Sequence, residues 1–311
     1  MDVVALAGGV GAGKFLRGLV RAVGARHVTA VVNTADDVEM HGLHVSPDLD
    51  SVTYWLAGVA DRERGWGRRG ETFRATGELR AFDPDAAWFN LGDLDLGTHL
   101  FRTRLLRAGL PLSAATERIA ARFGLGSRIL PMTDDPVTTR VAVEGGEELH
   151  FQEYWVRRGA RDPVAGIRYD GAEDARPGPG VLEAIGAAEA VVVCPSNPVA
   201  SIGPILAVPG VRDAVAARRD RAVGISPIVG GAPLAGMADR LMPAVGLEVS
   251  AVGAARAYDG LLAAWVLDAV DRDLAPKVGE LFGLRVAAVD TIMTDDARAE
   301  AVARAALDLL G

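Results

Sequence analysis

The amino-acid sequence predicts an α/β fold in which a mostly parallel sheet is flanked by helices. The run Val3–Ala7 is short and wholly apolar, and it ends at Gly8, as expected of a central parallel strand covered on both faces. The same rhythm returns later, where the β-rich runs 188–194 and 221–225 are each followed by a polar loop and a helical pattern. Strands that alternate with helices form parallel sheets, because parallel neighbours need a crossover connection.

The N-terminal segment has the pattern of one strand–helix–strand unit. After the glycines at 8–13, apolar residues recur at helical spacing over residues 15–23. Residues 28–33 are again β-rich and lead into the acidic stretch 33–37. We therefore expect two neighbouring parallel strands whose carboxyl ends carry a glycine turn and an acidic loop.

The middle of the chain differs from both ends. Residues 51–123 show helical patterns and few strand signals, which predicts a mostly helical section carried on the core. Residues 138–143 and 148–152 flank Gly145 and Gly146, a β-hairpin signal. Residues 162–180 are rich in Gly, Pro and charge and are expected to be an exposed connection. We expect residues 1–311 to form a single α/β domain.

Composition excludes several classes of protein. The 311 residues are half hydrophobic with a net charge of −8, which argues against a sequence-independent nucleic-acid binder. No apolar run reaches the roughly 18 residues that a membrane span needs. The one cysteine, Cys194, cannot form an internal disulfide, which fits a reducing cytoplasm. We therefore expect a cytoplasmic protein with no nucleic-acid or membrane partner.

The glycine-rich segment 8–14, GGVGAGK, is a candidate phosphate-binding turn. Glycines allow a ligand to approach the backbone closely, and the start of the following helix offers unpaired N–H groups. A P-loop would need Ser or Thr after Lys14, where this chain has Phe15, and the spacing of a dinucleotide-binding fingerprint is also missing. The alternative is a tight turn that binds nothing.

Acidic residues follow the second predicted strand. Asp36 and Asp37 end that strand, and Asp48 and Asp50 lie a short loop later. Carboxylates suit Mg²⁺, which usually takes one or two of them together with substrate phosphates. One of them could instead take a proton from a hydroxyl nucleophile. Because Asp48, Asp50 and Ser51 precede the helical pattern at 52–56, helix capping is the alternative for them, and spacing alone leaves the choice open.

Polar groups gather in three further segments. Asp93, Thr98 and His99 lie in the glycine-bearing segment 91–99. The loops 195–198 and 226–231 follow two later strands, and ligands of parallel sheets bind beyond the carboxyl ends of strands. Together with the first glycine turn, these loops predict a nucleotide site at one edge of the sheet.

With these motifs in order, the sequence resembles the 2-phospho-L-lactate transferase (CofD) family of deazaflavin coenzyme biosynthesis over nearly its whole length. The matching segments are the glycine turn, VVNTADD at 31–37, SPDLDS at 46–51, GWG at 65–67, LGDLDLGTHL at 91–100, LPMTDDPVTT at 130–139, HFQEYW at 150–155, PSNPVASIGPILAVPG at 195–210, SPIVGG at 226–231 and TIMT at 291–294.

The resemblance implies a reaction and its participants. Family members transfer the acid-bearing phosphoryl group of a guanosine diphosphate ester of lactate or enolpyruvate to the ribityl hydroxyl of the deazaflavin Fo, and they release GMP. It also implies a Rossmann-like core, Mg²⁺ dependence and a homodimer. No motif in the sequence distinguishes the possible three-carbon acids, namely lactate, enolpyruvate and glycerate.

Motif matching assigns expected roles to named residues. Asp48 and Asp50 are the expected catalytic carboxylates, and Asp37, Asp48 and Asp50 are the expected metal ligands. The expected substrate-binding residues are Gly9, Gly11, Gly13, Lys14, Asn33, Asp93, Thr98, His99, Ser196, Asn197, Ser226 and Gly230.

The chain departs from the family pattern at two positions. Leu94 stands where relatives have a basic residue, so a contact from that side chain to Fo cannot form, and Gly97 replaces the usual Ala. The competing interpretation is a related group of regulators that bind a uridine diphosphate sugar without turnover. They share the glycine turn and the NTADD-like loop, but the segments 46–51 and 91–100 together favour the transferase.

Overall fold

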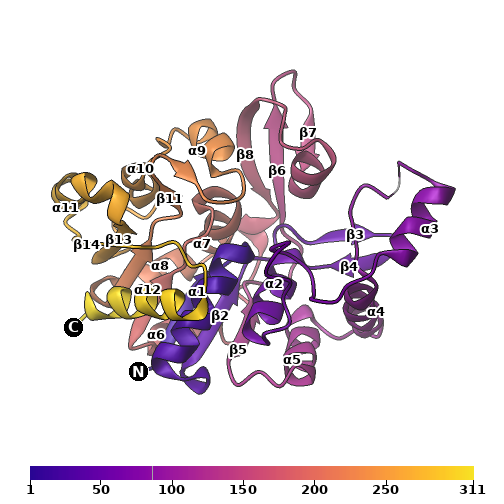
Figure 1. Ribbon diagram of the computed structural model, residues 1–311, viewed down its shortest axis with the longest axis horizontal. Coiled ribbons are helices and arrows are strands. Elements are labelled where there is room, and N and C mark those ends of the chain that lie inside the picture. The colour runs from indigo at the N-terminus through magenta and orange to yellow at the C-terminus, as the bar shows by residue number, and fades with distance from the viewer. Residues whose placement is uncertain (86) are drawn as a thin grey trace.

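The computed structural model describes residues 1–85 and 87–311, and its centre is a seven-stranded sheet (Figure 1). All neighbouring strands in it are parallel, in the order β14-β13-β10-β9-β1-β2-β5. These strands are β1 Val3–Ala7, β2 Val28–Val32, β5 Arg128–Pro131, β9 Ala190–Val193, β10 Ala222–Ile225, β13 Ala264–Asp268 and β14 Arg285–Val289. The predicted α/β fold with a parallel sheet flanked by helices is confirmed.

The sheet is buried on both faces, as the apolar strand sequences predict. In β1, Val4 and Leu6 point into one hydrophobic core, whereas Val3, Ala5 and Ala7 point into the other. The second core is closed by α1 Gly9–Val23, α2 Pro47–Leu56, α5 Leu112–Arg122 and α12 Asp296–Asp308. The first is closed by α6 Val181–Ala187, α7 Gly203–Ala207, α8 Val211–Ala216, α9 Ala238–Ala244, α10 Ala251–Arg256 and α11 Ala275–Phe282.

Helix α12 at the end of the chain lies beside α1 at its beginning (Figure 1). Ion pairs join the two helices, from Arg17 to Asp296 and from Arg21 to Glu300. A methyl group at Gly18 would overlap the backbone of Ala299, so the helices approach each other as closely as a glycine allows.

The order of the strands reverses at β1, between the two halves of the sheet. From β1 the chain moves outward through β2 to β5, and it then returns to place β9, β10, β13 and β14 on the other side of β1. Ligands of open parallel sheets bind at such a reversal, outside the carboxyl ends of the two central strands. Here the loops at the reversal follow β1 and β9, and they include the glycine turn and residues 195–198.

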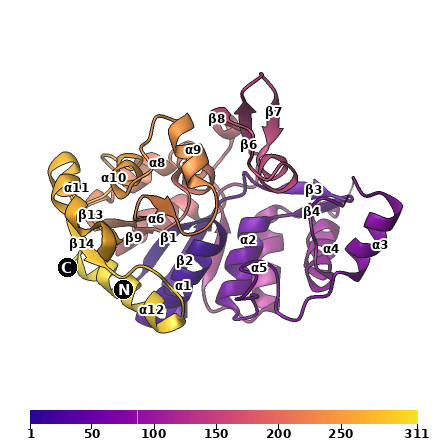
Figure 2. The ribbon, with the colours of Figure 1, turned by 45° about the horizontal axis from the view of Figure 1, so that its top comes forward.

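The mostly helical middle section is confirmed and lies at one end of the molecule (Figure 2). It contains α2, α5, α3 Arg74–Phe82 and α4 Asp93–Arg107. A hairpin that the sequence did not predict, β3 Val38–Met40 with β4 Leu43–Val45, leads into it. This hairpin is too short, at three residues a strand, to show a clear alternating pattern.

The predicted hairpin is confirmed, but it belongs to a three-stranded sheet. Strand β6 Thr138–Val143 pairs with β7 Glu148–His150 on one side and with β8 Val164–Asp170 on the other. The expectation that 162–180 is an exposed connection was therefore wrong for its first half. Exposed Arg168 and Asp170 alternate with half-buried Ile167 and Tyr169 in β8, and these charges hid a strand with one covered face.

Short strands β11 Ile228–Val229 and β12 Ala232–Pro233 form a last small hairpin after β10. Within the described part of the chain, every helix is too short or too polar to span a bilayer.

Candidate functional site at the carboxyl edge

Three glycines of the turn, Gly8, Gly11 and Gly13, are packed closely against other parts of the protein. A Cβ at Gly8 would lie 2.6 Å from an oxygen of Asp48, one at Gly11 would lie 2.6 Å from the carbonyl oxygen of Pro195, and one at Gly13 would lie 2.6 Å from the ring of Trp55. Such contacts do not occur between real atoms, so packing alone excludes side chains there. Gly9 differs, because its φ of +74° favours glycine and the nearest side-chain atom to its Cβ position is 3.9 Å away. Gly9 is therefore the glycine that packing leaves accessible to a ligand.

Lys14, in the first turns of α1, points toward Trp55 on α2. Its ammonium lies 5.6 Å from the centre of the Trp55 ring, at a narrow hollow that Arg62, Thr294 and Asp296 also line. A cation over an indole face is stabilised by the ring quadrupole. The structure thus gives Lys14 a contact with Trp55, and its expected contact with a substrate stays a prediction.

Four segments that are distant in sequence meet beside the glycine turn. The amide of Asn33 donates to Asp48 at 3.0 Å and to the carbonyl of Ala200 at 3.3 Å, and its own oxygen accepts from the N–H of Ala35. Ser196 donates to the carbonyl of Gly8 at 2.8 Å. The structure therefore brings Asn33, Asp48 and Ser196 together beside the glycine turn.

The other three expected loop residues after β9 and β10, namely Asn197, Ser226 and Gly230, take part in the structure of their own loops. The side-chain oxygen of Asn197 accepts from the N–H groups of Val199 and Ala200 and caps the π-helical turn Pro198–Ile202. Ser226 bonds both backbone groups of Ile228, and the N–H of Gly230 donates to Asp271. Asn197 keeps a free NH₂ group for a ligand, whereas the geometry of Ser226 and Gly230 is explained by the loop itself.

Two buried carboxylates stand close to the turn. Burial is the main cause that raises the pKa of Asp48 to about 7, and the hydrogen bond from Asn33 opposes it. Burial, followed by the negative charge of Asp48, also holds the pKa of Asp36 well above its usual range. A cation bound beside two such carboxylates would stabilise their charged forms, because a positive charge offsets the repulsion between them.

Asp37 is held at the base of the β3–β4 hairpin. One of its oxygens accepts from Ser46 at 2.6 Å and lies 2.8 Å from Nε2 of His44, while its second oxygen is buried without a partner. Burial raises its pKa, and the contact with His44 opposes this rise.

Asp50 lies on the opposite side of α2 from Asp48. Two residues along a helix correspond to about 200° of rotation, so the two carboxylates diverge. Both oxygens of Asp50 accept from the guanidinium of Arg102 on α4, one of them at 3.1 Å. Nδ1 of His99 lies 3.6 Å from Asp50, and burial lowers the pKa of His99 to about 4, which leaves its ring neutral at pH 7.

Asp93 has a structural role in the described protein. Its carboxylate accepts from the hydroxyl of Thr72 and from the N–H groups of Arg74 and Ala75, at the start of α3. These bonds satisfy N–H groups that a helix start leaves unpaired. Thr98 and His99 are buried on α4, and the expected substrate contacts of all three residues stay predictions.

Asp95 is buried beside this group, and Asp95→Asn is expected to stabilise the ligand-free protein at pH 8 by up to about 4 kcal/mol. Burial, followed by the charge of Asp50, raises the pKa of Asp95 to about 7 from 3.8. The fold therefore favours protonated Asp95. This contribution is complete below about pH 4, and it is lost as the pH rises through about 7. Urea unfolding at pH 5 and pH 8 measures the difference, which should shrink at the lower pH.

Asp93→Asn is the matched comparison two residues away and should act with the opposite sign. The hydroxyl of Thr72 is the main cause that lowers the pKa of Asp93. Its contribution to stability is therefore present above about pH 4 and is lost in acid. If the free energy of unfolding at pH 8 were lower than that of the wild type in both variants, the conclusion that the buried charge of Asp95 destabilises the fold would be wrong.

The residues present fit a magnesium ion that also binds substrate phosphates. Oδ1 of Asp36 and Oδ1 of Asp37 are buried without hydrogen-bond partners, close to Asp48. Mg²⁺ commonly takes one or two carboxylates and completes its shell with phosphates and water. Among the residues that the structure describes, no three His, Cys, Asp or Glu side chains form a complete metal site. These residues therefore fit an ion that protein carboxylates and substrate phosphates would hold together. Asp50 is paired with Arg102 and is the least available of the three expected ligands.

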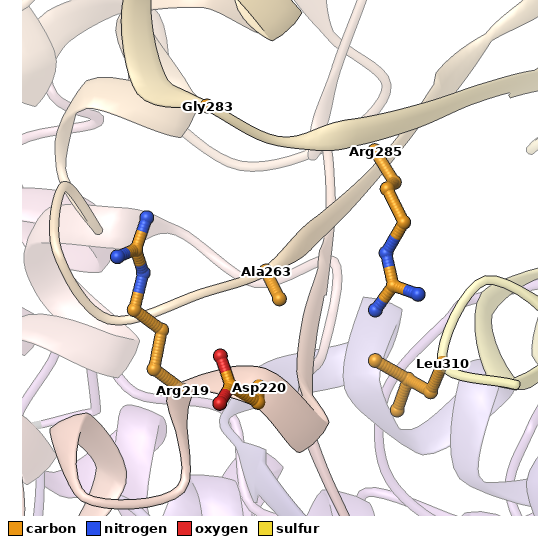
Figure 3. Close-up of a pocket in the computed structure, with 6 residues that line it drawn as sticks. All are labelled: Arg219, Asp220, Ala263, Gly283, Arg285 and Leu310. Carbon is orange, nitrogen blue, oxygen red and sulfur yellow. The ribbon is translucent and has the colours of Figure 1, made fainter.

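A separate hollow of about 450 Å³ lies at the opposite edge of the sheet (Figure 3). It is lined by Arg219, Asp220, Ala263, Gly283, Arg285 and Leu310. These positions surround the amino ends of β10, β13 and β14, whereas the predicted site residues surround carboxyl ends. The hollow is therefore distinct from the candidate site.

Sequence reasoning missed several residues of the site. Arg102 and His44 lie outside the expected set, although they contact Asp50 and Asp37 directly. Asp36 was noted as acidic but was given no role, and Ser201 packs at the position that a Gly8 side chain would occupy. No local pattern identifies Arg102, because an arginine on an amphipathic helix is ordinarily exposed.

Comparisons with known proteins identify the family. Residues 3–301 match the family model of 2-phospho-L-lactate transferase CofD. Proteins named phosphoenolpyruvate transferase from Streptomyces griseus and Streptomyces coelicolor are 51% and 50% identical, covering 99% of this chain and 98% of theirs. The protein of that name from Mycolicibacterium smegmatis is 44% identical over 100% of this chain and 99% of its own.

A crystal structure of a Bacillus halodurans protein shares the fold, with a TM-score of 0.64 at 19% identity and coverage of 98% of this chain and 99% of the other. The family model and the curated relatives favour the transferase over the regulator. The chain therefore belongs to the 2-phospho-L-lactate transferase (CofD) family of coenzyme F420 biosynthesis, and it is an enzyme that transfers a phosphate-containing group.

Proposed function

We propose that this enzyme transfers a phosphoenolpyruvyl or phospholactyl group from its guanosine diphosphate ester to the ribityl hydroxyl of Fo and releases GMP. The observation that carries this proposal is the position of Asp48. Its carboxylate is buried against the glycine turn, beside β1 and β9, where the strand order reverses and a phosphate ligand of this fold is expected. A proton acceptor then lies beside the phosphate site.

Enolpyruvate is the three-carbon acid that we favour. Relatives with 44–51% identity over almost the whole chain are named phosphoenolpyruvate transferase. The family model carries the name of the phospholactyl reaction instead. Because the two acids differ by two hydrogen atoms, one pocket can accept both, and we expect a preference for enolpyruvate rather than an exclusive choice.

The proposed step moves one phosphoryl group. The acceptor hydroxyl oxygen attacks the phosphorus that carries the acid, the bond from that phosphorus to the oxygen of GMP breaks, and GMP leaves with the electron pair. Asp48, the carboxylate that lies against the glycine turn, is proposed to take the proton of the hydroxyl. Asp50, which the sequence led us to expect as a second catalytic carboxylate, is paired with Arg102 and is proposed to act through the position of α2, without touching the reacting atoms. Positioning and charge supply most of the rate in such transfers.

The remaining expected residues divide between donor and metal. Gly9 and the free amide group of Asn197 are proposed to hold the guanosine diphosphate part, and Asn33 is proposed to contribute by orienting Asp48. Asp37 and Asp48, with Asp36 beside them, are proposed to hold Mg²⁺. When bound, the ion would offset the negative charge of the diphosphate.

The decisive experiment incubates the protein with Fo, Mg²⁺ and enolpyruvyl- or lactyl-diphosphoguanosine made enzymatically. Mass spectrometry should detect the phospho-acid adduct of Fo together with GMP, and a larger amount with the enolpyruvyl donor. A control without Mg²⁺ should form much less adduct. Absence of the adduct with every such donor, together with tight binding of a uridine diphosphate sugar, would refute the transferase assignment in favour of the regulator.

We further propose that the enzyme acts in the cytoplasm as a homodimer, without nucleic acid or membrane as a partner. The net charge of −8 and the single buried Cys194 support this proposal. Sedimentation equilibrium measures the oligomeric state directly.

A further inference from the structure

Arg102 on α4 is a buried cation at the centre of the acidic residues. Its side chain is 1% exposed, and its two terminal nitrogens donate to the two oxygens of Asp50. One of these nitrogens also donates to the backbone carbonyl of His44 at 3.4 Å. The next residue on α4, Thr103, accepts from the N–H of His44 at 2.8 Å. A single turn of α4 therefore holds both α2 and the β3–β4 hairpin.

The two held segments carry the proposed catalytic and metal-binding side chains. The first turn of α2 carries Asp48 on one side and Asp50 on the other, so a grip on Asp50 sets the rotation of α2 and thereby the position of Asp48. The imidazole of His44 lies 2.8 Å from Asp37. Arg102 is thus linked to Asp48 through Asp50, and to Asp37 through His44.

Stability alone does not account for this buried ion pair. Removing two charges from water costs several kcal/mol, and well-packed apolar side chains of similar size are often as stabilising or more so. The Nε atom of Arg102 is, moreover, buried without a partner. A forked guanidinium nevertheless has one advantage over an apolar pair, because two parallel hydrogen bonds fix the orientation of a carboxylate.

We propose that Arg102 is a positioning residue for the transfer reaction, acting through Asp50 to hold the first turn of α2 and Asp48 against the glycine turn. This inference rests on the proposed function. Arg102 is buried, whereas Arg104, two residues further along α4, is exposed and stacks on Phe101. Arg104 is therefore the natural control.

The test compares Arg102→Lys, Asp50→Asn, the double variant and Arg104→Lys in steady-state transfer assays. Lysine keeps the buried charge but not the fork, so the variant is expected to fold. We expect Arg102→Lys to lower kcat by at least about tenfold, with KM for the donor changed by less than about twofold. In the Asp50→Asn background the same change should cost less than about twofold, since the positioning path is already broken. Arg104→Lys should behave as the wild type.

Hydrogen exchange of the backbone amides in residues 48–53 gives a second result that does not depend on turnover. Arg102→Lys should raise exchange there, relative to the rest of the protein, by at least about fivefold, whereas Arg104→Lys should not. Unchanged exchange, a kcat within about twofold of the wild type, or independent and additive effects of the two substitutions would each overturn the proposal. If the wild-type protein shows no transfer while exchange responds as expected, the proposed function fails. The conclusion that Arg102 holds the first turn of α2 in place then still stands.

Discussion

Asp48→Asn is expected to lower kcat by at least about 100-fold while the protein stays folded. Asparagine has the same shape and can still accept the hydrogen bond that Asn33 donates at 3.0 Å. It cannot take a proton from a hydroxyl nucleophile, and it is a much weaker ligand for Mg²⁺ than a carboxylate. The loss should therefore affect chemistry and metal binding and leave the packing of the glycine turn intact.

The same variant should be more stable than the wild type in the absence of ligands. Asp48 is buried, and burial is the main cause that raises its pKa to about 7. At pH 8 the folded wild type therefore carries an unfavourable buried charge, which the amide removes. Active sites often hold such destabilising groups, and their replacement exchanges activity for stability.

Three measurements check this prediction together. Transfer assays report kcat, thermal unfolding without ligand reports stability, and thermal unfolding with added Mg²⁺ reports cation binding. Mg²⁺ should raise the melting temperature of the wild type more than that of Asp48→Asn. Asp308→Asn removes an exposed carboxylate on α12 and should match the wild type in all three. Normal turnover by Asp48→Asn would exclude Asp48 from the reaction.

Gly18→Ala is expected to destabilise the fold by at least about 3 kcal/mol. A methyl group at this position overlaps the backbone of Ala299 on α12, and backbone cannot yield as a flexible side chain can. The helices would have to separate, which disturbs the ion pairs Arg17–Asp296 and Arg21–Glu300 and opens the core beneath them. Urea unfolding followed by circular dichroism measures the loss.

Gly77→Ala is the matched control on α3. Nothing lies within 4 Å of the Cβ position of Gly77, and its backbone is helical. An alanine there should raise stability by about 0.5–1 kcal/mol, because glycine in a helix costs conformational entropy. The same chemical change thus has opposite signs at two helical glycines. Equal effects at both would show that contact with α12 does not constrain Gly18.

Local sequence patterns were sufficient for the core architecture. Short runs dominated by apolar and β-branched residues predicted β1, β2, β9 and β10, because a strand covered on both faces leaves little room for polar residues. They also predicted that the glycine turn and the loops after later strands share one edge of the sheet. That expectation follows from parallel order alone, and contacts from Gly8 to Ser196 and from Gly11 to Pro195 agree with it.

Local patterns failed where a residue's partner is distant. The sequence could not place β8, whose exposed charges resemble those of a loop, because its pairing with β6 and the packing of Ile167 and Tyr169 on the core are both tertiary contacts. It could not tell that Lys14 lies over Trp55, or that Asp93 caps α3, since both partners come from other segments. The choice between capping and chemistry for Asp48 and Asp50 stayed open for the same reason.

The sequence by itself determined that this protein is a parallel α/β enzyme and to which family it belongs, and it predicted which segments border the candidate site. These properties depend on residue type and on order along the chain. Only the tertiary structure decided how the acidic residues are divided, with Asp48 facing the glycine turn and Asp50 facing Arg102 on another helix. The physical reason is that burial, ion pairing and the rotation of α2 depend on contacts across about 50 residues of chain, which no local spacing encodes.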